Sequence, residues 1–313
     1  MLLLGVIIAA SLILLFVTRA AKSSNEAVDL PCILDFFKRA SSDQSPDERM
    51  SNLPMAIRYL NSLAAMHGNK QMRLQAAVFA LKSYRDDDRV VLLALTQLSL
   101  LVNNYTDTSI QNLLQQDQHV VIKTIQSSLS RAKLVDEPPE KDERLSSEIQ
   151  RRGCLLLGGC AENIEAAAHI IGSGGMNAII DALQWYRFHA GVSKWGLWAV
   201  FHLCYDRPEY QSSFVEKNGI QTVCQCIKNN NCVDVTRHGI AILFDAMRNN
   251  TESSAQAKVI AFQEGLNDLL LECMDEYHDD AEICMMCQQI LGGAATYAPV
   301  NDNGCQLESD ISS

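Results

Sequence analysis

The sequence has little that would build a β-sheet. It contains no alternating Val, Thr and Tyr runs, and its Asn218-Gly219 pair is flanked by helical periodicity rather than by strands. Aromatic residues make up only 6% of the chain, whereas 48% of residues are apolar, chiefly Leu, Ala and Ile. None of the seven prolines interrupts a strong helical segment, and Pro54 and Pro208 stand where a first helical turn accepts proline. This composition predicts an all-α fold with a sizeable core.

The sequence also lacks the usual catalytic motifs. It has no HExxH or GxSxG pattern and no phosphate-cradling loop after a strand. Cys284 and Cys287 have CxxC spacing, but no second pair lies nearby to complete a zinc site, so core packing is the better interpretation. His278, Asp279, Asp280 and Glu282 could resemble a metal cluster, but they lie between two predicted helices, where a charged loop is expected. We therefore expect no catalytic residue, no cofactor, no metal and no enzymatic activity.

Positive charge is the minority charge. Lys and Arg number 26 against 37 Asp and Glu, a formal net charge of -11. Because binding to phosphates needs a basic face, this balance argues against nucleic acid as the main ligand. The eleven cysteines are unevenly spread and several fall inside apolar helical patterns, where a free thiol acts as a small apolar side chain. We expect a reducing compartment rather than a disulfide framework.

One long apolar run stands at the amino terminus, from Leu2 to Val17, followed by Arg19 and Lys22. As a helix it would span about 24 Å, slightly less than the ~30 Å hydrocarbon core. It can be a signal peptide cleaved after residue 20 or 21, or a retained anchor. The anchor is favoured because the basic residues follow the run instead of preceding it, which leaves the body of the protein in the cytosol.

Residues 1–22 are therefore predicted to be a single-pass transmembrane signal-anchor. A short apolar segment, a basic flank after it and a cytosolic body resemble the signal-anchored proteins of the mitochondrial outer membrane, with the endoplasmic reticulum as second choice. Two sequons begin at Asn104 and Asn249, and they would matter only if the body were lumenal.

Internal repeats dominate the rest of the chain. Four apolar blocks that end in small residues align through Leu155, Ala199, Ala241 and Cys287, which are separated by 44, 42 and 46 residues. A second mark lies between these blocks: a short helix, a glycine turn and another apolar helix. It occurs at 170–183, 214–227 and 261–273, with turn glycines at Gly175, Gly219 and Gly265. Weaker copies of the first mark lie at 55–65 and 91–101, and a weaker copy of the second mark, without its glycine, lies at 117–129.

Because the two marks share one period, the sequence resembles the armadillo repeat family. The resemblance is clear from about residue 160 to 295 and plausible from about residue 53. The resemblance implies a right-handed superhelix of α-helices, an α-solenoid of about five to six repeats. The predicted organisation is an N-terminal hydrophobic helix (1–22), a linker and short helix (23–52, with a loop at 41–52), a repeat domain (53–297) and a disordered tail (298–313). A charged loop at 133–147 interrupts the repeats.

In this family the third helix of each repeat lines a concave groove, where a Trp and an Asn four residues later grip an extended peptide. Trp198 and His202 occupy these two positions in one repeat. The other copies carry Leu93/Gln97, Cys154/Gly158, Ile240/Phe244 and Met286/Ile290, so the ladder is missing. The resemblance then implies a more apolar groove, suited to an amphipathic helix, an extended peptide or another copy of the fold. Its expected contacts are Gln97, Trp195, Trp198, His202 and Phe244, although Trp195 and Phe244 can equally be core residues.

The sequence thus predicts a membrane-anchored scaffold that binds partner proteins at an organelle surface. The alternative is a lumenal or secreted armadillo protein that acts as a nucleotide-exchange factor for an Hsp70 chaperone.

Overall fold

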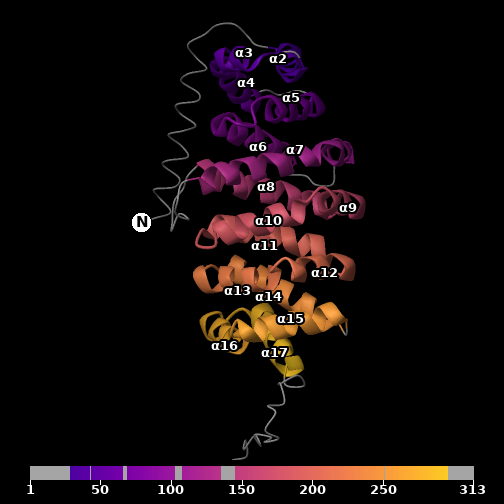
Figure 1. Cartoon of the computed structure of the whole chain (residues 1–313), viewed down its shortest axis with the longest axis vertical. Helices are drawn as coiled ribbons and strands as arrows, with labels where there is room; N and C mark the ends of the chain where they lie inside the picture. The colour runs from indigo at the N-terminus through magenta and orange to yellow at the C-terminus, as the bar shows by residue number, and fades with distance from the viewer. Residues whose placement is uncertain are drawn as a thin grey trace, which may run out of the picture. The chain divides into compact units, whose positions relative to one another are not determined.

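The computed structural model describes residues 29–42, 44–65, 69–102, 108–134, 145–249 and 251–294. Within these residues the chain forms 16 helices and no strand, so the predicted all-α class is confirmed (Figure 1). The chain divides into two compact units, Met1–Leu203 and Cys204–Ser313. Unit 1 contains α2 (Leu30–Ser42), α3 (Pro46–Ser51), α4 (Leu53–Ala65), α5 (Lys70–Ser83), α6 (Asp88–Val102), α7 (Thr108–Lys133), α8 (Leu145–Ala161), α9 (Ile164–Gly172), α10 (Gly175–Trp185) and all but the last residue of α11 (Ala190–Cys204). Unit 2 contains α12 (Pro208–Glu216), α13 (Gly219–Asn229), α14 (Val233–Arg248), α15 (Glu252–Gln263), α16 (Leu266–Glu276) and α17 (Ala281–Ala294).

From α9 onward the helices recur in triplets: α9–α11, α12–α14 and α15–α17. The first helix of a triplet has 9 to 12 residues, the second has 11 and the third has 14 to 16. Side-chain caps start two of the first helices, because Asn163 accepts from the Ala166 amide and Thr251 from the Ser254 amide. The period found in the sequence is therefore a period of three helices.

The turn before each second helix corrects the sequence alignment. The residues in left-handed conformation are Gly174 (φ 81°), Asn218 (φ 61°) and Gly265 (φ 76°). Gly175 and Gly219, expected as turn glycines, are instead the first residues of their helices. A Cβ at Gly175 would lie 2.8 Å from the carbonyl oxygen of Ile170, so glycine is needed there for close packing. Gly265 thus matches Asn218, one position before Gly219.

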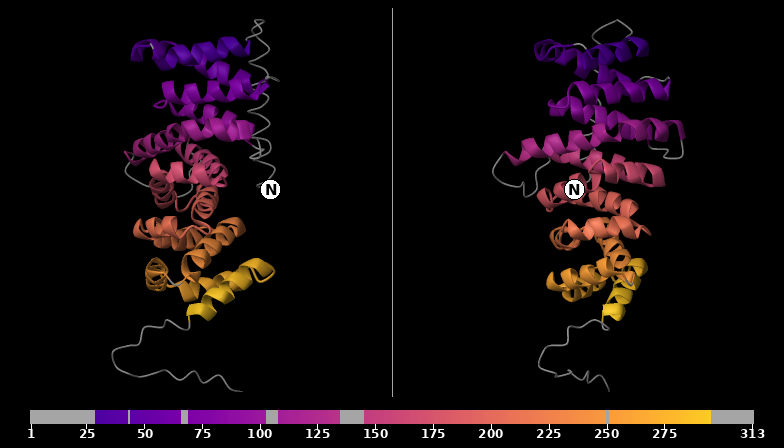
Figure 2. Two further views of the ribbon diagram at one scale, coloured as in Figure 1. Left: turned by 90° about the vertical axis from the view of Figure 1, so that its right-hand side faces the viewer. Right: turned by 45° about the vertical axis from the view of Figure 1, so that its right-hand side comes forward.

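Within each unit, helices pack on their counterparts in the next repeat. In unit 1, α2 packs on α5 and α5 on α7, while α4 packs on α6 and α6 on α8 (Figure 2). In unit 2, α12 packs on α15, α13 on α16 and α14 on α17. The core lies between these layers and consists mainly of fully buried Leu, Ile, Val and Ala side chains. Contacts limited to neighbouring layers are typical of repeat proteins.

The earlier helices are less regular than the triplets. The turn and second helix expected at 117–129 lie within one continuous helix, α7, of 26 residues. Residues 46–51, expected as part of a loop, form α3, which starts with a capping box between Ser45 and Glu48. The predicted charged loop at 133–147 also extends too far, because α8 begins at Leu145 and buries Ser146 and Ser147. Residues 135–144 of that loop lie outside the described residues.

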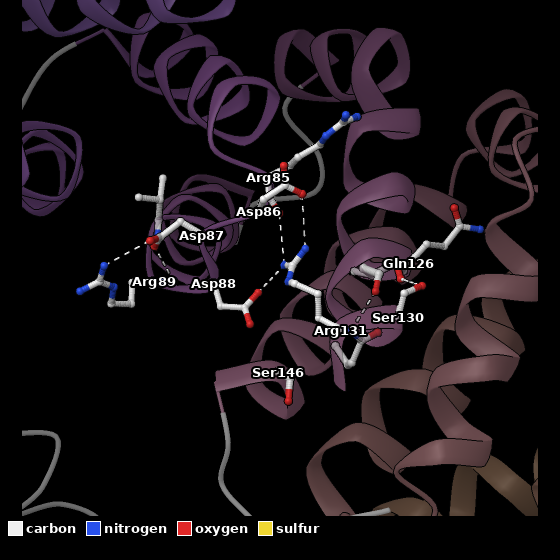
Figure 3. Close-up of polar contacts among 12 residues, drawn as sticks. Arg85, Asp86, Asp87, Asp88, Arg89, Gln126, Ser130, Arg131 and Ser146 are labelled. Atoms are coloured by element: carbon white, nitrogen blue, oxygen red, sulfur yellow. Dashed lines mark hydrogen bonds and ion pairs between the residues drawn. The ribbon is translucent and has the colours of Figure 1, made fainter. Parts of the chain in front are cut away.

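Polar contacts join residues about one repeat apart. At the end of α7, the Arg131 guanidinium pairs with Asp88, lies 3.5 Å from an oxygen of Asp86 and donates to the Arg85 carbonyl at 3.2 Å (Figure 3). It thereby binds α7 to the turn between α5 and α6. Arg237 makes an equivalent contact in unit 2, donating to Asp280 at 2.6 Å. Each of these arginines lies 43 residues from its main partner.

Tyrosines mark the ends of three second helices, a signal that the sequence alignment did not use. Tyr84, Tyr186 and Tyr277 are the C-caps of α5, α10 and α16. The buried Tyr186 hydroxyl donates to the Ser146 hydroxyl at 2.8 Å, and the Tyr277 hydroxyl donates to Asn231 at 3.3 Å. These two bonds also connect neighbouring repeats.

The predicted anchor (1–22) and the tail (298–313) lie outside the described residues. Among the helices that are described, none combines the length and apolar character needed to cross a bilayer.

Candidate partner-binding surface

The predicted ladder residues lie on α11. This helix begins after His189, whose Nδ1 accepts from the Val192 amide at 3.2 Å. Its buried side is formed chiefly by Val192, Leu197, Val200 and Leu203. Trp195, Trp198 and His202 are spaced by three and four residues, so they share another side of the helix, where all three are partly exposed.

The three rings of this stripe stack edge to face. The Trp195 and Trp198 rings lie 5.5 Å apart at 89°, and the Trp198 and His202 rings lie 4.6 Å apart at 71°. Such pairs contribute roughly 0.5–1.5 kcal/mol beyond area burial, and they hold each other in a fixed geometry. We call Trp195, Trp198 and His202 the α11 stripe.

Gly158 on α8 makes room for the stripe. A Cβ at this position would lie 2.5 Å from Cε3 of Trp198 and 3.0 Å from the Cα of Ala199. Gly158 is the residue that the sequence alignment places at the preceding ladder position. Because Gly158 has no side chain, it leaves a space on α8, and the ring of Trp198 from the next repeat occupies that space.

One cation lies beside the stripe, and two more lie beside aromatic rings in the segment that precedes α11. The Lys194 ammonium lies 5.1 Å from the Trp195 ring centroid, the Lys133 ammonium 5.8 Å from that of Trp185, and the Arg187 guanidinium 4.8 Å from that of Phe188. Residues 182–205 contain all three tryptophans and no Asp or Glu, although the chain has 37 acidic residues. Aromatic rings beside cations can bind a segment that carries both apolar side chains and carboxylates.

Of the other two predicted contacts, Gln97 does not join the stripe, and Phe244 belongs to the other unit. Gln97 on α6 is only 3% exposed, and its Oε1 has no hydrogen-bond partner, so its side chain belongs to the interior. Phe244 is half-buried on α14, in unit 2. The structure therefore brings together Trp195, Trp198 and His202 of the five predicted residues.

The buried cysteine thiols among the described residues are poorly suited to act as nucleophiles. Burial raises the pKa of Cys154 and of Cys287 to about 12. Such thiols stay protonated near neutral pH, whereas the thiolate is the nucleophile and metal ligand. No group of three or more His, Cys, Asp or Glu residues that could hold a metal ion occurs in the described part of the chain.

Among the charged residues at 278–282, Asp280 has a clear role in the fold. Asp280 accepts from the Ile283 amide at 3.1 Å and the Glu282 amide at 3.2 Å, which caps α17, and it also accepts from Arg237. The Ile283 amide and the Arg237 guanidinium lower the pKa of Asp280. This carboxylate therefore combines a helix cap with a contact between repeats.

Sequence inspection missed one buried carboxylate. Asp245 on α14 is 3% exposed; it accepts from Gln211 at 2.6 Å and pairs with Arg248 at 2.9 Å. Burial raises its pKa, while Arg248 opposes the shift. The only sequence signal was the Asp-Arg spacing of three, which is common on helix surfaces. Asp245 lies within a hydrogen-bonded network, and we assign it a structural role.

Comparison with protein-family models, with curated proteins and with solved structures finds no match to this chain.

Proposed function

We propose that this protein is a membrane-tethered scaffold of armadillo type, which binds a partner protein and catalyses no reaction. Its repeats form a right-handed superhelix whose third helices line the partner-binding groove. The α11 stripe is the centre of that groove.

The armadillo assignment is supported by the triplets α9–α11, α12–α14 and α15–α17. A left-handed residue precedes each second helix, and third helices pack on third helices, as α6 does on α8 and α14 on α17. Each triplet has two helices of 9 to 12 residues joined by that turn, followed by a longer third helix; the turn and the long third helix are the features that match an armadillo repeat. Because such folds serve many binding tasks, the assignment of a partner rests on the groove residues alone.

The binding role is supported by one observation above all, the α11 stripe. Tryptophan is enriched among residues that dominate binding energies, and rings held by mutual stacking lose little freedom on binding. The partner is an amphipathic helix or an extended peptide with apolar and acidic side chains, which fit the rings and Lys194 respectively.

The binding role is tested with one variant in the stripe and one at the lysine beside it. Once proximity labelling has named a partner, its affinity is measured for Trp198→Ala and for Lys194→Glu. Truncation of a binding hot spot costs about 2 kcal/mol or more, a loss of about 30-fold in affinity. The charge reversal weakens binding without leaving a cavity, so it separates loss of binding from loss of folding. Leu134→Ala, at a side chain that is 81% exposed, is the control. Unchanged affinity in both Trp198→Ala and Lys194→Glu contradicts the proposal.

The tether is proposed from the apolar run Leu2–Val17 and from Arg19 and Lys22 after it. It places the body in the cytosol, on the mitochondrial outer membrane first and the endoplasmic reticulum second. Protease digestion of isolated organelles, with a tag at the C-terminus, tests this topology. Loss of the tag without detergent is the expected result. Protection of the tag together with glycosylation at Asn249 contradicts a cytosolic body and favours the lumenal chaperone-exchange alternative.

A further inference from the structure

One side of α13 is covered by the helices of the next repeat. Both α15 and α16 pack on α13, and the Lys228 ammonium donates to the Glu264 carbonyl at the end of α15. Burial raises the pKa of Cys224 to about 12, and the charges of Lys228 and Glu264 also act on this thiol. The side that carries Cys224 and Lys228 therefore faces the following repeat. Its apolar residues, all buried, are Ile220, Cys224 and Ile227.

The corresponding side of α16 is uncovered. Counted from the match between Asn218 and Gly265, the counterparts of the three buried residues are Asn267, Leu271 and Met274. Leu271 is 56% exposed, Asn267 is exposed and Met274 is partly exposed. The last helix among the described residues is α17. Two apolar side chains thus lie in the open at a position where the preceding repeat is covered by helices.

Acidic residues surround these apolar side chains. Residues 259–294 contain eight Asp and Glu residues and no Lys or Arg. On α16, Asp268, Glu272 and Asp275 are exposed at helical spacing beside Leu271. Among the described residues, none forms an ion pair with these three carboxylates. We call Asp268, Leu271, Glu272, Met274 and Asp275 the α16 face.

The carboxylates of this helix do not stabilise it. Asp268 and Glu272 are four residues apart, and like charges at this spacing destabilise a helix. Asp275 and Glu276 lie in the last turn of α16, which has no basic residue, so they also oppose the helix dipole. A binding role accounts for a charge pattern that folding does not favour.

Charge distinguishes the possible occupants of the α16 face. A second copy of the same face would bring more carboxylates against it. The segment after α17, residues 295–313, contains three acidic residues and no Lys or Arg. A basic helix, in contrast, would neutralise the face. On α13 the counterpart of Asp275 is Lys228, the cation that contacts the next repeat, so on α16 the cation has to come from the occupant.

We propose that the α16 face binds a basic amphipathic helix of a partner protein. Apolar side chains of that helix pack on Leu271 and Met274, and its Lys or Arg residues pair with Glu272 and Asp275. The bound helix takes the place that helices of the next repeat take on α13. The inference concerns residues of unit 2 alone, so it depends neither on the proposed tether nor on the α11 stripe.

The test measures the binding of synthetic peptides by fluorescence anisotropy. The full chain is held in phosphatidylcholine nanodiscs, and empty nanodiscs give the blank. The probe is an amphipathic helix of Leu and Lys; one control peptide has the same composition in scrambled order, and another has Glu in place of Lys. We expect the probe to bind about 10-fold more tightly than the scrambled peptide, because only the probe presents Leu side chains on one side. The Glu peptide should not bind.

Charge variants connect this binding to the α16 face. Glu272→Gln with Asp275→Asn should weaken the probe about 10-fold at low salt, because two charge pairs are lost. Glu209→Gln with Glu216→Gln removes the same charge from exposed positions on α12 and should change the affinity by less than about 2-fold. Urea unfolding should show that the first double variant is at least as stable as the wild type, since repulsion within α16 is relieved. Weaker binding is then not a loss of folding.

Leu271→Gln tests the apolar half of the contact. It should weaken the probe about 5-fold, because a buried Leu contact is lost. Ile164→Gln, at a side chain that is 73% exposed on α9, is the matched control and should leave the affinity unchanged. Four results would each overturn the proposal: no binding of the probe, equal binding of the probe and the scrambled peptide, equal affinities of the two charge variants, or unchanged affinity in Leu271→Gln.

Discussion

Residues 30–161 and residues 164–294 build the same kind of layered helices by different local means. The later region, α9–α17, repeats three helices with a left-handed residue before each second helix. The earlier region, α2–α8, has no residue at positive φ among those described, and its α7 runs through 26 residues without a turn. Packing nevertheless follows the same order, as α4 on α6 and α6 on α8 demonstrate.

The difference shows that the turn and the packing are separate determinants. A left-handed turn strongly favours Gly, Asn or Asp, so it leaves a visible mark in the sequence. Packing of apolar faces requires only that apolar residues recur at helical spacing, and many sequences satisfy this condition. The earlier repeats are therefore real in the structure and faint in the sequence.

The largest expected effect comes from filling the tight turn of the later region. In Gly219→Val, the new side chain would meet the Phe214 ring and the Phe214 carbonyl oxygen, which lies 2.5 Å from the position of a Cβ. Overpacking of this kind lowers the free energy of unfolding by about 3 kcal/mol. Urea unfolding followed by circular dichroism measures the loss.

Gly172→Ala is the matched control, because no atom lies within 4 Å of its Cβ position. Its free energy of unfolding should change by about 0.5 kcal/mol or less. A similar stability for Gly219→Val and for the control would show that the later region does not depend on its close turns.

These turns explain both the success and the limit of the sequence alignment. Gly175, Gly219 and Gly265 have nearly the right spacing, but two of them begin helices and one occupies the left-handed position. A glycine required for close approach and a glycine required for positive φ look the same in a sequence. Only the backbone distinguishes them.

The candidate surface was predictable to a similar degree. Helical spacing places Trp195, Trp198 and His202 on one side of α11, and the structure has them there. Helical spacing does not predict how deeply a side chain is buried. Gln97 was therefore expected at the surface, but its side chain is buried. The burial of a side chain depends on how closely neighbouring helices approach, as α8 does at Gly158. A single sequence does not specify these approaches.

The next largest effect concerns the left-handed position itself. Gly265→Ala places a Cβ at φ 76°, where an ordinary residue costs roughly 1–2 kcal/mol. Gly265→Asn should cost less, because Asn218 already adopts φ 61° at the matching position. Urea unfolding of both variants compares the costs. Equal losses would contradict the match between Gly265 and Asn218.

Arg131 and Arg237 compare the two regions directly, since each joins neighbouring repeats. Arg131→Met releases Asp86 and Asp88, and Arg237→Met releases Asp280 and Asp234. Both guanidiniums are about one-third exposed, so each loss should be about 1 kcal/mol, and smaller at high salt. Unfolding at low and high salt tests this. A salt-dependent loss in only one variant would mean that the regions do not use equivalent contacts.

The smallest expected effect is a difference in how the buried polar groups of the two regions make the free energy of unfolding depend on pH. The earlier region buries neutral amides such as Gln97 and Gln150, whereas the later region buries the Asp245 carboxylate. Burial raises the pKa of Asp245 in the folded state above its ordinary value, although Arg248 and Gln211 oppose the shift. The folded protein therefore holds this proton more tightly than the unfolded chain does. The resulting stabilisation is complete below the ordinary pKa and is lost as pH rises through the folded-state value.

Asp245→Asn removes that titration while its amide oxygen can still accept from Gln211. The free energy of unfolding of the wild type, minus that of the variant, should fall with rising pH across this acidic range and then stay constant toward neutrality. Gln97→Glu would not serve as a control, because it adds a new buried charge. Gln150→Leu keeps the residue neutral and should leave the pH dependence unchanged. A difference between wild type and Asp245→Asn that rises with pH would show that Arg248 outweighs burial, and the carboxylate would then stabilise the later region in its charged form.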